Sequence, residues 1–423
     1  MTATAGDAVR DTWCRSLPDR SLAALRAAAE SLSAGQLRPH GYDYCYLNLL
    51  TIFRDSCSPA QLSSIAIACL RNYLYSGEEF HAYCLAARGK RPWNAEMRAL
   101  DTATDFTPGA RSTLNGLLAK GSIIVCGFHW GAYRFIPVGL GALGFPVASI
   151  LNTAASVKYA SYSSFNGAEI AEARARGVSE AFYRARVIDT RRRLKLLDCI
   201  RSAKRAPACL FFPVDGMFTD APTQRDVEIS FAGYPLRVKA NPASLAASLI
   251  APLVVVFASR ESPTKITLDV ADVIEPGSGP AFVQAATQRM YAPLEERIKG
   301  WSEQWEGART FHHLRKVSPV PRVAPSPEDL ATVRAGIERD QLSLQESRVA
   351  CMQLLDGSRS WVDCLTLRCF GRTPETRRML AAIQERGNVA NLWREFRNDE
   401  ERSRSLIQIL GQLRAEGLLT VGT

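Results

Sequence analysis

The sequence predicts an α/β protein with a mainly parallel or mixed sheet that is flanked by helices. A helical N-terminal part precedes this sheet, and a small, mainly helical domain follows it. Three observations support the prediction: apolar residues at helical spacing in residues 1–120, short apolar runs that alternate with helical patterns from about residue 120, and a proline-rich stretch before the last hundred residues.

The helical spacing is clearest in residues 60–89, where apolar side chains recur every three or four positions. Beyond residue 120 the apolar runs are too short for helices, and we expect them to be strands. These runs are residues 122–128, 145–151, 208–214, 252–258 and 265–271. Strands that alternate with helices favour a sheet that is covered on both faces.

Two stretches without charge, residues 135–157 and 240–259, are long enough to cross a membrane. Each contains prolines in its interior, and an interior proline breaks a spanning helix. We therefore interpret each stretch as a helix followed by a strand, and we expect at most a peripheral contact with a membrane surface.

A domain boundary is indicated by residues 318–327, which contain four prolines and have the composition of a stiff, extended linker. We expect a main domain at residues 1–316, the linker at 317–327 and a second domain at 328–423. The second domain begins with a capping box, and two further helices and a terminal apolar run follow. This order predicts a winged-helix-like fold.

The net charge of +10 lies entirely in residues 1–323, because residues 324–423 contain fourteen arginines and fourteen acidic residues. A basic surface attracts anionic partners such as acidic carrier proteins or phospholipid headgroups. The neutral tail lacks the positive charge that phosphate contacts need, so we expect it to dock to a protein and not to nucleic acid.

Eleven cysteines form no CxxC pair, and several lie in apolar runs, where a free thiol behaves as a small hydrophobe. The first residues lack the apolar stretch of a secretory signal. Both features favour a reducing cytoplasm, with the inner face of the membrane as an alternative location.

Two other patterns carry little functional weight. Residues 139–144, GLGALG, match a dinucleotide-binding fingerprint, but the glycines begin eleven residues after the strand instead of directly after it. We interpret Gly144 as a helix C-cap before a proline. The neighbours His312 and His313 lack the accompanying Cys or acidic residues of a metal site, so we predict no metal.

The strongest candidate for chemistry is His129, which follows the apolar run 122–128. In open α/β sheets, sites form at the ends of the strands. A histidine has an ordinary pKa of about 6.5, so its neutral form is available as a general base at cytoplasmic pH. A structural histidine is the alternative.

Residues 122–135, SIIVCGFHWGAYRF, resemble the first motif of the lysophospholipid acyltransferase superfamily, nearest its lauroyl and myristoyl transferases of lipid A biosynthesis. Residues 210–222 are similar to the strand of that family that ends in an aspartate, here Asp215. Residues 227–261 resemble its phenylalanine, glycine and proline segment, and residues 290–305 resemble its closing helix with a tryptophan motif. The resemblance covers roughly residues 40–313.

The resemblance implies transfer of an acyl group from a thioester, on acyl carrier protein or coenzyme A, to a hydroxyl or amine. His129 would deprotonate the acceptor, and the acyl thioester is the co-substrate, so no other cofactor is expected. Substrate contacts are expected from the motif residues, which are Trp130, Tyr133, Arg134, Phe231, Gly233 and Pro235.

The chain departs from the family at Arg134, where the family has the acid that orients the histidine. A guanidinium cannot accept the imidazole N–H. Either another carboxylate, such as Asp215, replaces the acid, or the chain is a non-catalytic protein that binds acyl groups or their carriers. We expect Arg134 to face the pocket and to bind an anionic acceptor. The arginine-proline element of the family, linked to its usual acceptor, is missing from residues 149–167.

A basic stretch, residues 184–205, contains nine Arg and Lys and has an apolar face that includes Ile188. One interpretation is a solvated helix. The other is a docking site for an acidic carrier protein or for a phosphopantetheine phosphate, with Arg191, Arg192 and Arg193 at its centre.

Overall fold

The computed structural model of the chain describes residues 19, 21–53, 55–151, 165–189, 193–215, 226–314, 323–345, 348–353, 359–364, 368–371, 373–385 and 389–422. The chain divides into two compact units, Met1–Cys45 with Ser64–Arg315, and Tyr46–Ser63 with Lys316–Thr423. The second unit includes residues 46–63, which the proline-rich boundary did not predict.

The first unit contains a seven-stranded mixed sheet with the order β1-β9-β8-β2-β5-β3-β4. Its strands are β1 (Thr104–Phe106), β2 (Ile123–Gly127), β3 (Val147–Leu151), β4 (Ala185–Asp189), β5 (Cys209–Pro213), β8 (Leu253–Ser262) and β9 (Lys265–Ile274). Strands β8, β2, β5, β3 and β4 run parallel, and β9 is antiparallel to β8. The predicted α/β class and all five predicted strands are confirmed.

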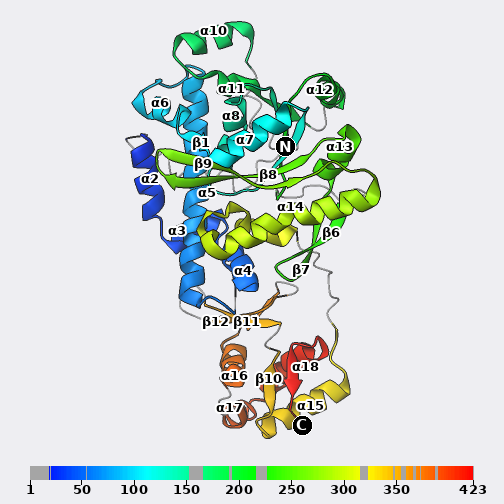
Figure 1. Cartoon of the computed structure of the whole chain (residues 1–423). Helices are drawn as coiled ribbons and strands as arrows, with labels where there is room; N and C mark the ends of the chain where they lie inside the picture. The colour runs from blue at the N-terminus through cyan, green and yellow to red at the C-terminus, as the bar shows by residue number, and fades with distance from the viewer. Residues whose placement is uncertain are drawn as a thin grey trace. The chain divides into compact units, whose positions relative to one another are not determined.

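Helices cover both faces of this sheet (Figure 1). Those before the sheet are α2 (Leu22–Ser31), α3 (Ala34–Leu37), α6 (Ala95–Asp101), α7 (Pro108–Leu118) and α5 (Pro59–Ala87) from Ser64 onward. Most of α4 (Tyr42–Phe53) and the start of α5 belong to the second unit. Those between and after its strands are α8 (Ile136–Gly141), α10 (Gly167–Ala175), α11 (Glu180–Arg184), α12 (Arg193–Arg205), α13 (Asn241–Leu249) and α14 (Gly279–Trp301). The predicted helical N-terminal part is confirmed.

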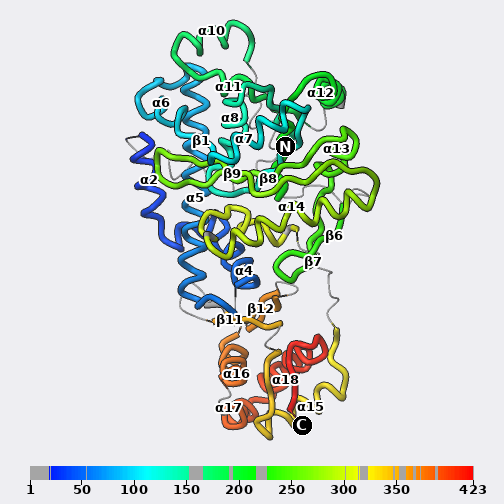
Figure 2. The backbone as a smooth tube through the Cα atoms, in the orientation of Figure 1, coloured from blue at the N-terminus to red at the C-terminus, as the bar shows by residue number. Residues whose placement is uncertain are grey.

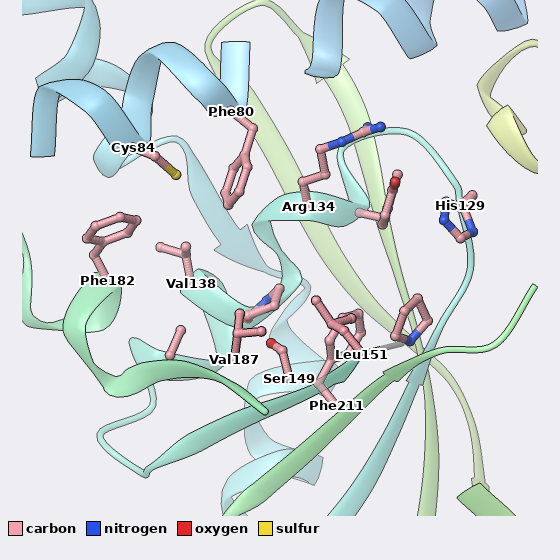
Figure 3. A pocket seen from close by; sticks show the side chains of 14 residues that line it. Phe80, Cys84, His129, Arg134, Val138, Ser149, Leu151, Phe182, Val187 and Phe211 are labelled. Atoms are coloured by element: carbon pink, nitrogen blue, oxygen red, sulfur yellow. The ribbon is translucent and has the colours of Figure 1, made fainter. Parts of the chain in front are cut away.

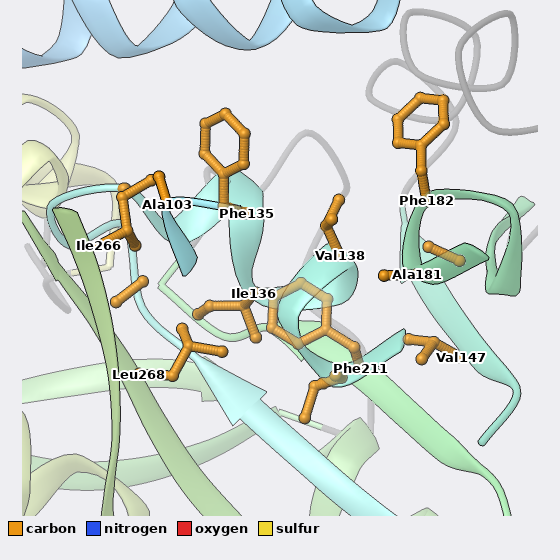
Figure 4. Close-up of a cluster of buried hydrophobic side chains, with 14 of the residues drawn as sticks. Ala103, Phe135, Ile136, Val138, Val147, Ala181, Phe182, Phe211, Ile266 and Leu268 are labelled. Atoms are coloured by element: carbon orange, nitrogen blue, oxygen red, sulfur yellow. The ribbon is translucent and has the colours of Figure 1, made fainter. Parts of the chain in front are cut away.

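One face of the sheet carries a large apolar core. Residues of α5, α7, α8 and α11 pack there against Val125 of β2, Phe211 of β5 and Leu268 of β9 (Figure 4). On the other face, Tyr291 of α14 makes an edge-to-face contact with Phe128, at 5.2 Å between ring centroids. The sheet is therefore buried on both sides, as its apolar strand sequences require.

Two of the three glycines in residues 139–144, Gly139 and Gly141, allow close packing. A Cβ on Gly141 would lie 2.2 Å from the carbonyl oxygen of Ala181, and one on Gly139 would lie 2.3 Å from Leu268. Helices α8 and α11 consequently lie side by side (Figure 2). The C-cap of α8 is Ala142 and not Gly144 as predicted. Gly144 lies two residues further on, in the turn before β3, with a φ of +91° that favours glycine.

The two uncharged stretches form a helix and then a strand, as predicted: α8 with β3, and α13 with β8. No helix among the described residues has the length and apolar character needed to cross a membrane. The expectation for residues 184–205 was wrong in part. Residues 185–189, with Ile188, form the edge strand β4, whereas Arg184 ends α11 and Arg193–Arg205 form α12.

The second unit contains helices and small antiparallel sheets. Its C-terminal part contains the helices α15 (Pro327–Glu338), α16 (Pro374–Gln384), α17 (Val389–Phe396) and α18 (Glu400–Ala415). Its strands are β10 (Leu342–Leu344), β11 (Val349–Gln353), β12 (Arg359–Asp363), β13 (Cys369–Phe370) and β14 (Leu419–Val421). Ser326 and Asp329 form the predicted capping box. The terminal strand β14 pairs with β10, and β11–β13 were not predicted.

Candidate active site

Two adjacent parallel strands bring the site together. Gly127, the last residue of β2, is paired with Pro213, the last residue of β5. His129 and Asp215 each follow two residues later along their strands. Parallel strands end at the same edge of a sheet, so this register places the two side chains next to each other.

Asp215 holds both the backbone and the ring of His129. Its Oδ1 accepts the backbone N–H of His129 at 2.8 Å and lies 2.7 Å from the ring Nδ1. A carboxylate only accepts hydrogen bonds, so Nδ1 carries the proton and Nε2 presents a lone pair. Asp215 is 2% exposed, whereas the His129 side chain is 24% exposed. Asp215 therefore fixes the imidazole through Nδ1, while the ring remains partly exposed.

The second carboxylate oxygen of Asp215 faces a buried indole. Asp215 Oδ2 and Trp305 Nε1 are both buried, and neither has a hydrogen-bond partner among the described residues. Both atoms lie 2.4 Å from the position that a Cβ on Gly307 would occupy, so they are at most twice that distance apart. Gly307 also donates its N–H to the carbonyl of His129 at 3.2 Å. The segment from Trp305 to Gly307 therefore packs against the carboxylate of Asp215.

We expect Gly307→Ala to damage the site, because the added methyl group would overlap both Asp215 Oδ2 and the Trp305 indole. Overpacking a buried position costs roughly 1–3 kcal/mol. Displacing the carboxylate should also lower any activity of His129. Thermal unfolding and turnover of the purified variant measure the two effects.

The matched control is Gly300→Ala in α14, where an added Cβ meets no atom within 4 Å. Alanine is favoured over glycine in a helix by up to about 1 kcal/mol, so this variant should be as stable as the parent or slightly more stable. Equal thermal stability and equal turnover of the Gly307→Ala and Gly300→Ala variants would contradict the packing described around Gly307.

Arg134 is part of a separate buried ion pair. Its Nη1 donates to Glu306 Oε2 at 3.0 Å and to the hydroxyl of Ser76 at 2.6 Å. The side chains of Arg134 and Glu306 are 4% and 1% exposed. Asn72 donates to Glu306 Oε1 at 3.4 Å. The charge at position 134 is thus neutralised within the protein.

This geometry bears on the expectation that Arg134 faces the pocket and binds an anionic acceptor, of which the binding stays a prediction. The guanidinium does lie in the wall of the pocket beside His129, but Glu306 already supplies its counter-charge. Binding a second anion there would compete with a buried carboxylate. Asp215, and not residue 134, is the acid next to His129.

An apolar pocket of about 110 Å³ begins at His129. Figure 3 shows His129 at one end of this pocket, with Phe182 and Cys84 at the other. The lining residues are Phe80, Cys84, His129, Tyr133, Arg134, Pro137, Val138, Ser149, Leu151, Phe182, Ala185, Val187, Phe211 and Pro213. Burial raises the pKa of the Cys84 thiol well above its usual value, so this wall residue is neutral.

The remaining predicted substrate contacts divide into two groups. Tyr133 lines the pocket, and its ring centroid lies 4.4 Å from that of His129. Trp130 is buried and donates to Ser259 at 3.3 Å, outside the pocket lining. Phe231 packs in the core against Trp305.

Gly233 and Pro235 belong to a hairpin and not to the pocket. Strands β6 (Asp226–Phe231) and β7 (Tyr234–Lys239) are antiparallel, and Gly233 lies in the turn between them with a φ of +78°. Both Gly233 and Pro235 are exposed. Their expected substrate contacts therefore do not correspond to the pocket at His129.

The predicted docking residues are only partly visible. Arg191 and Arg192 lie outside the described residues, and Arg193 begins α12 without a described side chain. The rest of α12 exposes Lys195, Arg201, Lys204 and Arg205. The helix is therefore a basic surface in its described part.

Sequence reasoning missed Glu306, Trp305 and Gly307 as site residues. They belong to a short segment around the 3₁₀ turn Glu306–Arg309, which has no periodic pattern. The only available signal was the position of this segment directly after the closing motif, which ends at Trp305. A glutamate directly after that tryptophan could have been considered as the partner of an unmatched arginine.

Among the described residues, no group of three or more His, Cys, Asp or Glu side chains is arranged to hold a metal ion. His312 stacks on Tyr44, at 4.6 Å between ring centroids. A comparison with models of known protein families finds no match to the chain, and a search of curated protein sequences finds no significant match either.

Proposed function

We propose that this protein is an acyltransferase that moves an acyl group from a carrier-protein or coenzyme A thioester to a hydroxyl or amine. The observation that carries the proposal is the contact between Asp215 and His129 at the mouth of an apolar pocket. It provides the carboxylate that the motif lacks at position 134. The resemblance of residues 40–313 to the lysophospholipid acyltransferases supports the same reaction class.

In this proposal His129 Nε2 accepts the proton of the acceptor O–H or N–H as the oxygen or nitrogen attacks the thioester carbonyl. The new bond to the carbonyl carbon forms, and the C–S bond then breaks. The leaving thiolate takes the proton from the imidazolium. Asp215 stabilises the imidazolium and keeps the ring in the tautomer with a free Nε2.

The pocket suits the acyl chain of the donor. Its walls are almost entirely apolar, and burial of hydrocarbon gives roughly 0.8 kcal/mol per CH₂ group. Its volume of about 110 Å³ is several times the minimum that one water molecule needs, so it can hold a segment of hydrocarbon chain. Medium-length chains, from octanoyl to dodecanoyl, are the first donors to test.

The basic helix α12 supports a thioester carrier as the donor. Its exposed Lys195, Arg201, Lys204 and Arg205 can pair with an acidic carrier protein or with the phosphates of coenzyme A. Asp198 is the only acidic residue within α12, and its Oδ1 lies 3.5 Å from Nη1 of Arg201. We do not assign the tail a part in the reaction.

The test is acyl transfer itself. Purified protein is incubated with decanoyl-coenzyme A and pools of hydroxyl and amine acceptors, and free thiol and acylated products are measured. The proposal predicts thiol release that depends on the acceptor and a product heavier by one acyl group. Tight binding of decanoyl-coenzyme A without any product would favour the alternative, a non-catalytic acyl-binding protein.

A further inference from the structure

The floor of the pocket comes from three adjacent strands, β5, β3 and β4. Ser149 of β3 is paired with Phe211 of β5 on one side and with Val187 of β4 on the other. Residues in register on neighbouring strands project from the same face of a sheet. Leu151 and Pro213 line the pocket two residues further along. Among the described floor residues, Ser149 alone is polar.

The hydroxyl of Ser149 is available for a ligand. Ser149 is 5% exposed, and its oxygen is directed into the cavity in Figure 3. It makes no hydrogen bond with any residue that the structure describes. A hydroxyl can both donate and accept one, and burying it without a partner is unfavourable. A plain alkyl chain in this pocket would leave the hydroxyl without water and without a partner.

We propose that Ser149 selects an acyl chain that carries an oxygen substituent, a hydroxyl or a carbonyl, part of the way along its length. This inference rests on the proposed function, because it takes the acyl chain to be the occupant of the pocket. Strand β3 lies two strands from β2, about 10 Å across the sheet. The substituent is therefore remote from the thioester carbonyl at His129 and not adjacent to it.

The specificity follows from an asymmetry in hydrogen bonding. A pocket that hydrogen-bonds a substrate oxygen discriminates against the analogue without it, because the protein group is then buried unpaired. An apolar wall offers no such discrimination, since an extra methylene changes binding only modestly. The single serine on an otherwise apolar floor thus distinguishes chains of equal length.

The experiment measures binding of decanoyl-coenzyme A and of its hydroxylated analogues to the full chain without an acceptor, by titration calorimetry. The analogues carry the hydroxyl beside the thioester, at mid-chain or at the terminus. We expect a mid-chain or terminal analogue to bind about tenfold more tightly than the plain chain, the size of one well-made hydrogen bond. Ser149→Ala should abolish this preference and bind the plain chain at least as well.

The matched control is Val187→Ala, the register neighbour of Ser149 on β4. It enlarges the same part of the floor but keeps the hydroxyl, so overall affinity should fall while the preference persists. Equal binding of plain and hydroxylated chains by the parent protein would overturn the role of Ser149 and leave the proposed function intact. If none of these thioesters bound, both the role of Ser149 and the acyl pocket would have to be abandoned.

Discussion

His129→Ala should reduce acyl transfer by roughly 10²–10⁴-fold, the usual contribution of a positioned general base. The fold should survive, because the imidazole lies on a loop after β2 and its side chain is 24% exposed. Added imidazole should restore part of the activity, since it can occupy the space that the side chain vacates beside Asp215. Initial rates with and without imidazole measure both effects.

His312→Ala is the matched control, because His312 stacks on Tyr44 and is not part of the pocket lining. This variant should transfer acyl groups at the rate of the parent protein. A folded His129→Ala variant with full activity would exclude His129 as the base.

Glu306→Ala should be the most destabilising single substitution near the site. It leaves the guanidinium of Arg134 buried without the carboxylate of Glu306, although Nη1 still donates to the hydroxyl of Ser76. Removing one partner of a buried ion pair costs about 3–5 kcal/mol. Chemical denaturation followed by tryptophan fluorescence measures the loss.

Two further variants test whether the destabilisation by Glu306→Ala comes from the buried ion pair and not simply from removing a glutamate side chain. Glu296→Ala removes an exposed partner of Lys299, and exposed pairs contribute at most about 1 kcal/mol. The double variant Arg134→Met with Glu306→Leu removes both buried charges and should recover most of the stability. If Glu306→Ala were no more harmful than Glu296→Ala, the buried pair would not have the role described.

The sheet could be predicted because its strands are apolar on both faces. Runs such as residues 122–128 and 252–258 are shorter than most helices and rich in β-branched residues, which favours buried strands. The strand β4 was missed because Ile188 continues the apolar spacing of the helix that follows it. An edge strand with half-exposed residues does not carry the apolar signature of a central one.

The site could be predicted only in part, for a geometric reason. His129 and Asp215 could both be identified because each directly follows an apolar strand run, and the strand register then brings them together. Glu306 lies 172 residues from Arg134 in the chain, and its segment has no regular pattern. The sequence therefore showed that Arg134 was unusual but not which residue neutralises it.

The pairing of His129 with Asp215 is most directly tested by Asp215→Asn. The amide nearly preserves the shape of the carboxylate but removes the charge that holds the Nδ1–H tautomer, so kcat should fall by about 10²–10⁴-fold with KM little changed. Steady-state kinetics with decanoyl-coenzyme A and the best acceptor provide the measurement. An Asp215→Asn variant with the kcat of the parent protein would contradict the account of this site.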